Sequence, residues 1–197
     1  MFHLLVKGGW VMIPLLICFI LAVAVTIERF YFFRCLNVKI FAEEVLAFVN
    51  KGEMSKALNL SKNSSEPLAR VLTAGIDNRS NSAKAMEAEG ISEVATMKRG
   101  LPVLDTIITL SPLLGLLGTI VGMINSFHIM AASGLGEPHA VTGGVAEALI
   151  ATATGISIAV IALIPYNYFL ARIERESEAI EHYASRLELA LNLAARE

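Results

Sequence analysis

The sequence predicts an all-α integral membrane protein with three transmembrane helices and a helical cytoplasmic domain. Of its 197 residues, 55% are hydrophobic and only 17% are charged, and the mean hydropathy is +0.61. This composition is too apolar for an ordinary water-soluble domain. Three uncharged runs, at residues 8–27, 106–136 and 148–171, are each long enough to cross a hydrocarbon core of about 30 Å as helices.

Lysine and arginine are unevenly distributed around these runs. Eleven of the sixteen fall between residues 28 and 104, four follow residue 171, and only Lys7 precedes the first run. Loops on the cytoplasmic side of a membrane carry the excess of basic residues. The sequence therefore predicts an N-terminus on the outer side of the membrane and a cytoplasmic C-terminus.

The apolar runs divide the chain into five segments. We expect an outer segment with the first transmembrane helix (1–27), a cytoplasmic helical insert (28–104), a second transmembrane helix (105–136), an outer loop end with the third transmembrane helix (137–171), and a cytoplasmic C-terminal helix (172–197). The first run lacks an Ala-x-Ala-like cleavage site and ends at the charged pair Glu28-Arg29. We therefore interpret it as an uncleaved anchor.

The cytoplasmic segments show helical patterns of their own. The insert predicts helices at 41–50, 55–60 and 83–98, with Pro67 as a helix breaker. Its eleven basic and nine acidic residues balance, which gives no reason to expect nucleic-acid binding. The tail repeats Ile173, Ile180, Leu187 and Ala194 every seven residues. Such a stripe serves helix packing in most proteins and subunit assembly in some.

Glu147 is the only ionisable residue between positions 142 and 164. A carboxylate at the centre of a bilayer costs roughly 2.5–3.5 kcal/mol or more, and such residues face protein or water and serve ion or proton passage. We therefore expect Glu147 to face an internal polar space on a proton route. The alternative is that Glu147 pairs with a basic group of a partner and only fixes assembly.

The second span carries one face of small and polar residues. These residues recur at alternating spacings of four and three, which aligns them along a helix: Ser111, Gly115, Gly118, Gly122 and Asn125. Small residues let helix backbones approach closely in lipid, so we assign the three glycines to packing within a ring or against a partner. Polar groups at this depth need partners or water. Thr119, Ser111 and Asn125 are therefore candidates for lining a pore.

The third span is also rich in glycine and alanine. Thr154 follows Glu147 by seven residues, so we expect it on the same face, about 10 Å deeper, as a further pore-lining candidate. Three helices of a single copy cannot easily bury so much small and polar surface. We therefore predict a closed homo-oligomer whose second and third spans line a central space.

Three stretches of the sequence resemble the MotA/TolQ/ExbB proton channel family. Residues 111–123 read SPLLGLLGTIVGM, residues 144–153 read GVAEALIATA, and residues 165–167 read PYN. The likeness extends to the insert, where residues 67–72 read PLARVL and residues 99–101 read RGL. The resemblance is nearer to the ExbB/TolQ branch than to the flagellar MotA branch, which has a fourth span.

This resemblance implies a pentameric ring around a single-span ExbD- or TolR-like protein that carries an intramembrane Asp. Proton flow would move ring against core in the inner membrane of a Gram-negative-type bacterium and do work on a periplasmic or outer-membrane client, for example through a TonB-like protein. Protons would be the coupling ion, with no other cofactor. The family pattern implies that Glu147, Thr119 and Thr152 line the proton route; Thr152 is assigned from the resemblance, because helical angle alone favours Thr154.

Two other classes of function compete with this one. A passive scaffold ring, which holds a partner's helix without conducting protons, fits the small-residue faces equally well. An intramembrane hydrolase does not fit, because the sequence has no nucleophile elbow, no metal-ligand cluster and no Ser/His pair at matching depth. We therefore expect a protein that is not an enzyme, and the choice of client depends on the partner.

Overall fold

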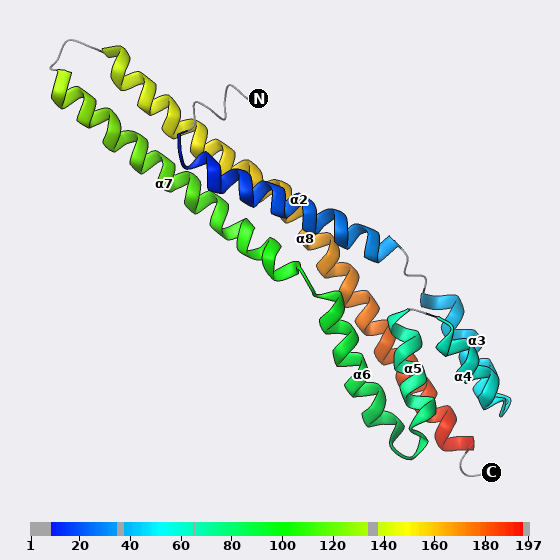
Figure 1. Cartoon of the computed structure of the whole chain (residues 1–197). Helices are drawn as coiled ribbons and strands as arrows, with labels where there is room; N and C mark the ends of the chain where they lie inside the picture. Colours follow the sequence, from blue (N-terminus) through cyan, green and yellow to red (C-terminus); the bar gives the residue numbers. More distant parts are fainter. Residues whose placement is uncertain (1–8, 35–37, 65, 134–137, 195–197) are drawn as a thin grey trace. The chain divides into compact units, whose positions relative to one another are not determined.

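The computed structural model describes residues 9–34, 38–64, 66–133 and 138–194. Every regular element in these ranges is a helix (Figure 1). The chain divides into two compact units, which are described separately. The first comprises Met1–Phe30 and Gly100–Tyr168, and the second comprises Tyr31–Arg99 and Phe169–Glu197.

The first unit contains the apolar parts of three long helices. They are α2 (Met12–Arg34), α7 (Leu101–Ser133) and α8 (Pro138–Ala194). Each contains a stretch long and apolar enough to cross a membrane. This confirms the prediction of an all-helical protein with three helices that can span a membrane, whereas its assembly into a ring stays a prediction.

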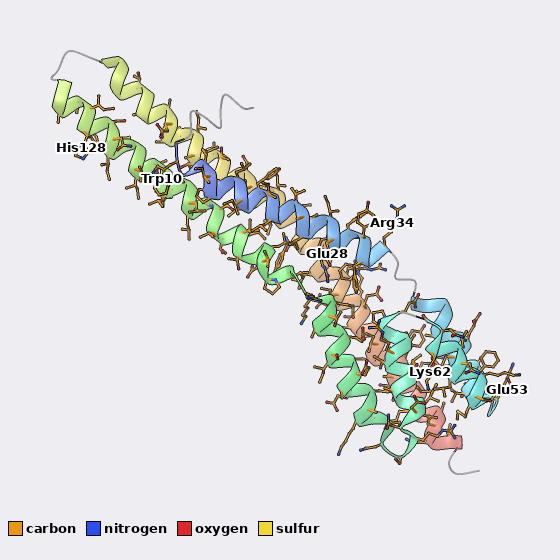
Figure 2. All side chains as sticks on the ribbon, in the orientation of Figure 1. Trp10, Glu28, Arg34, Glu53, Lys62 and His128 are labelled. Atoms are coloured by element: carbon orange, nitrogen blue, oxygen red, sulfur yellow. The ribbon has the colours of Figure 1, made fainter. Side chains whose placement is uncertain are left out.

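Helix α2 packs along one side of its own surface. Buried residues of its apolar part recur at helical spacing and, together with Val11 of the preceding turn, form a stripe: Met12, Leu15, Cys18 and Ala22. Trp10 lies two residues before α2 and is 63% exposed, and the charged residues of α2 gather at the other end, where Figure 2 labels Glu28 and Arg34. An apolar body with its charges at one end is typical of a membrane span.

The second unit is a small helical bundle. It contains α3 (Val38–Asn50), α4 (Met54–Lys62), α5 (Pro67–Asp77), the short 3₁₀ helix η1 (Arg79–Asn81), α6 (Ser82–Met97) and the C-terminal part of α8. Large aliphatic side chains fill its interior, among them Val45, Val49, Leu68, Leu72 and Leu187. Figure 1 shows α5 and α6 side by side next to the end of α8.

The helices of the insert agree with the predicted ones, and α5 is an additional helix. The predicted helices at 41–50, 55–60 and 83–98 correspond to α3, α4 and α6. The predicted break is present, because α4 ends at Lys62, and Pro67, which is buried, is the first residue of α5, a helix that was not predicted. Proline is well tolerated at the first position of a helix, where its missing N–H has no helical acceptor in any case.

The repeated apolar residues of the tail pack within the chain. Ile173, Ile180 and Leu187 are all buried, and Phe169 one turn earlier stacks on Phe33 with ring centroids 5.6 Å apart. The side chain of Ala194 lies outside the described residues. Of the two roles left open for this stripe, the structure supports packing inside the second unit.

Candidate functional site

Helices α7 and α8 cross at a line of small residues inside the first unit. On α7 the buried residues of this line are Ser111, Gly115, Gly118, Gly122 and Ser126, and on α8 they include Ala148, Ala151 and Gly155. A methyl group added to Gly115 would lie 3.0 Å from both the carbonyl oxygen of Ala151 and Cα of Thr152. A methyl group on Gly122 would lie 2.9 Å from Cβ of Ala148. The backbones of α7 and α8 therefore lie so close together that only glycine fits at these positions of α7.

The glycine face predicted for the second span is thus real, and its neighbour is α8 of the same chain. Gly115, Gly118 and Gly122 all face residues of α8, and Gly118 also lies close to Val11 of the turn before α2. Close packing inside one chain already accounts for these glycines. Their role in packing between subunits or against a partner stays a prediction.

Thr152 links the two helices by a hydrogen bond. Its hydroxyl donates to the carbonyl oxygen of Gly115 at 2.9 Å. Thr119 follows Gly115 by one helical turn, and its hydroxyl donates to the carbonyl oxygen of Leu116 at 2.7 Å, within its own helix. The structure therefore brings Thr119 and Thr152 to one side of the α7–α8 pair, which we call the threonine flank.

Glu147 lies on the opposite side of the pair. Its carboxylate lies against Gly9, where a methyl group would come 3.0 Å from Cδ of Glu147 and would overlap its Oε1. We call this side, which also carries Val11 and Gly118, the α2 flank. Thr152 is five residues beyond Glu147, which is about 140° around the helix. Within one chain, the three predicted route residues therefore do not converge.

The other predicted pore-lining residues do not form a cluster either. Thr154 is half-buried on the same side of α8 as Glu147, and its hydroxyl donates to the carbonyl oxygen of Ile150 at 2.8 Å. Asn125 is exposed on α7. Ser111 is fully buried at the crossing, and its hydroxyl has no hydrogen-bond partner among the described residues. Ser111 therefore faces α8 in this chain, and its exposure to a pore stays a prediction.

Sequence reasoning missed two residues of the site. Ser126 is buried, donates to the carbonyl oxygen of Gly122 at 2.9 Å and faces Gly144, so it continues the small-residue face where Asn125 was expected. Its spacing of four from Gly122 was the available signal. Gly9 was also missed, because no sequence pattern links it to a carboxylate so distant along the chain.

Polar interactions in the second unit are ion pairs between helices. Arg70 of α5 donates to Glu93 of α6 at 2.9 Å, with the Glu93 side chain only 6% exposed. Glu43 of α3 accepts from Arg186 and, at 3.3 Å, from the hydroxyl of Tyr183, both on α8. The bond from Arg186 holds the pKa of Glu43 below its ordinary value, while burial and then the charge of Glu43 raise the pKa of Tyr183.

These ion pairs have structural partners and do not form a reactive cluster. Among the described residues, no group of three or more His, Cys, Asp or Glu side chains is arranged to hold a metal ion. The Glu43 and Arg70 pairs each join two helices of the bundle. The three residues predicted for the proton route, Glu147, Thr119 and Thr152, all lie in the first unit.

Known proteins resemble this chain over nearly its whole length. The model of the MotA/TolQ/ExbB proton channel family matches residues 63–182. The chain is 33% identical over 190 residues to biopolymer transport protein ExbB-like 3 of Synechocystis, which covers 92% of this chain and 90% of that protein. It is 42% identical over 92 residues to the Tol-Pal system protein TolQ of Pseudomonas aeruginosa, covering 47% of this chain and 40% of TolQ.

The biopolymer transport protein ExbB of Salmonella typhimurium is 43% identical over 77 residues, covering 39% of this chain and 32% of that protein. The family match spans α5, α6, α7 and most of α8, and so includes Glu147 and both threonines of the threonine flank. This chain belongs to the MotA/TolQ/ExbB proton channel family.

Proposed function

We propose that this protein is an ExbB/TolQ-like subunit of an inner-membrane proton-channel motor. In this role it couples the proton motive force to mechanical work on a periplasmic or outer-membrane client, such as TonB-type transport energisation. Protons are the coupling ion. Glu147 is the residue of the chain that exchanges them or stabilises their passage, and Thr119 and Thr152 supply hydroxyl groups along the route.

The observation that carries this proposal is the solitary carboxylate of Glu147 in a long apolar helix. Residues 142–164 of α8 contain no other ionisable group. The membrane potential supplies about 2.3 kcal/mol per elementary charge per 100 mV, which is enough to bias movement between packed helices. A lone, half-buried carboxylate at this depth costs free energy, and membrane proteins contain such groups mainly where they serve ion or proton passage.

The proposed assembly is a homo-oligomeric ring, a pentamer by the family resemblance, around a single-span ExbD- or TolR-like partner with an intramembrane Asp. The separation of Glu147 from the threonine flank supports a route completed by other chains. In a ring, the two flanks of one α7–α8 pair face different neighbours, so Glu147 of one subunit and the threonines of another can share one passage.

The second candidate function is a passive scaffold that holds a partner's helix without conducting protons. The observation in its favour is that the glycine and alanine residues of the α7–α8 crossing are fully explained by packing. A scaffold explains the carboxylate in the apolar span only if a partner supplies a basic group to pair with it, which is why we favour the motor.

Proton flux in proteoliposomes distinguishes these two functions. The chain is reconstituted with a single-span ExbD- or TolR-like protein, a pH gradient is imposed, and flux is compared for wild type, Glu147→Gln and Glu178→Gln. Glu178 is an exposed carboxylate of α8 beyond the uncharged run and provides a matched control. We expect flux that needs the partner, is lost in Glu147→Gln and is retained in Glu178→Gln. Equal flux in all three would refute the role of Glu147, and no flux from an assembled wild-type complex would favour the scaffold.

A further inference from the structure

A side chain at Gly9 would meet the carboxyl group of Glu147, which would have to move aside. Its φ of +72° is in the left-handed region that favours glycine, and the space where a Cβ would lie is taken by the carboxyl group of Glu147. Cγ of Glu147 is also only 3.5 Å from that point. The absence of a side chain at position 9 is therefore what lets the carboxylate approach the backbone.

The turn that carries Gly9 is fixed to α2 and to the α7–α8 pair. The N–H of Met12 donates to the carbonyl oxygen of Gly9 at 3.1 Å, and the N–H of Ile13 donates to that of Trp10 at 3.2 Å. Val11 is 3% exposed and approaches Gly118. Gly9 is thus held in a defined position next to Glu147.

The position also suits a negative charge. Gly9 is three residues before the first residue of α2, a helix of 23 residues. The partial positive charge at a helix N-terminus stabilises a nearby carboxylate, and it does so more strongly when water is scarce. Steric room and helix dipole therefore act together on the same carboxylate.

We propose that Gly9 is a positioning residue for Glu147: the turn before α2 receives the carboxylate and keeps it on the α2 flank, away from Thr119 and Thr152 of the same chain. The consequence of this contact for proton transfer rests on the proposed function, whereas the contact between Gly9 and Glu147 does not depend on it. The turn before α2 thereby determines where the Glu147 carboxylate lies when it accepts or releases a proton.

The test is the reactivity of Glu147 toward dicyclohexylcarbodiimide, an apolar reagent that modifies carboxyl groups within membranes. The assembled complex in native membranes is treated as wild type, Gly9→Ala and Gly52→Ala, and modification at residue 147 is followed with time by mass spectrometry. Gly52 has nearly the same φ, +75°, with no atom within 4 Å of its Cβ position, so it controls for backbone strain. Glu147→Gln gives the background.

We expect Gly9→Ala to displace the Glu147 carboxylate from its position beside residue 9 and to increase the rate of its modification severalfold. The rate in Gly52→Ala should equal that of wild type. An unchanged or slower rate in Gly9→Ala, or an equal increase in Gly52→Ala, would overturn the proposal. If Gly9→Ala fails to assemble, the double variant Gly9→Ala/Glu147→Asp decides. Its carboxylate is one methylene shorter, so assembly should return, and its failure to return overturns the proposal as well.

Proton flux measured on the same variants separates this inference from the proposed function. A faster modification in Gly9→Ala together with normal flux in Glu147→Gln would keep the positioning role and reject Glu147 as a proton carrier. An unchanged modification rate together with lost flux in Glu147→Gln would keep the proton role and reject Gly9 as its positioning residue.

Discussion

The α7–α8 crossing and the bundle of the second unit hold their helices together by opposite means. At the crossing, glycine and alanine face each other and the contacts involve backbone atoms, as at Gly115 and Gly155. In the bundle, large side chains such as Leu68 and Leu72 are fully buried, and ion pairs such as Arg70 with Glu93 join the helices. The α7–α8 crossing leaves no room for large side chains, whereas large side chains fill the interior of the bundle.

This difference follows from the solvent that each sequence is suited to. Between helices in lipid there is no hydrophobic driving force, so association depends on close van der Waals contact and on hydrogen bonds such as that from Thr152 to Gly115. A bundle in water gains about 25 cal/mol for each Å² of apolar surface it buries. The crossing should therefore be sensitive to added atoms, and the bundle to removed ones.

The largest effect is expected from adding atoms at the crossing. Gly115→Leu would force a side chain into the backbone of α8 at Ala151 and Thr152, which cannot move aside. We expect a loss above about 4 kcal/mol, the range reached only by severe changes in a packed interior. Folded protein recovered from membranes, measured by size-exclusion chromatography in detergent, should fall to near background.

Gly143→Leu is the matched control for that loss. Gly143 lies in α8, and its Cβ position has no atom within 4 Å. Both changes replace glycine by leucine inside an apolar helix, so they differ chiefly in the space available. Equal recovery of the two variants, whether both high or both low, would break the comparison at the crossing.

Removing atoms from the bundle should have the next largest effect. Leu72→Ala deletes a fully buried side chain of α5 and leaves a cavity, at a cost of about 2–5 kcal/mol. Leu189→Ala makes the same chemical change at a side chain that is 65% exposed, and it should cost no more than about 0.5 kcal/mol. Thermal unfolding of the purified protein, followed by circular dichroism, measures both; a similar loss for the two variants would contradict a core centred on α5.

The sequence predicts that α7 has a face for close helix contact, but it does not predict which helix contacts that face. The spacing of Ser111, Gly115, Gly118 and Gly122 indicates a face that a second backbone approaches closely, and that face exists. A pattern on one helix does not say which helix approaches. The small residues of α7 and α8 favour contact between subunits when each helix is considered alone, although in the structure they contact each other.

Long-range contacts of single residues were also beyond the sequence. Hydropathy singles out Glu147 because it interrupts an apolar run, but nothing in the pattern tells that Gly9 makes room for it. Similarly, Pro67 signals both the end and the start of a helix, and only the buried face of α5 decides for the start. Periodicity reports on local structure, whereas these features depend on residues distant in sequence.

The smallest effect is expected at the exposed ion pair between Glu43 and Arg186, where neither a cavity nor a steric overlap is created. The hydrogen bond from Arg186 lowers the pKa of Glu43 below the ordinary 4.5. A carboxyl group whose pKa is lowered by folding stabilises the protein above the unfolded value, and that contribution is lost as the pH falls through the folded value. Both side chains are largely exposed, so solvent screens the pair and the gain is modest.

Glu43→Gln should therefore be slightly less stable than wild type at neutral pH, with the difference shrinking below about pH 4.5 as the wild-type carboxyl becomes protonated. Glu44→Gln is the control, because Glu44 is exposed on the same helix and has no ion pair among the described side chains. Thermal unfolding at a series of pH values measures both variants. A stability difference between wild type and Glu43→Gln that persists at low pH would mean that the substitution disturbs packing against Tyr183 instead. The edge of the bundle would then depend on close packing, as the α7–α8 crossing does along its whole length.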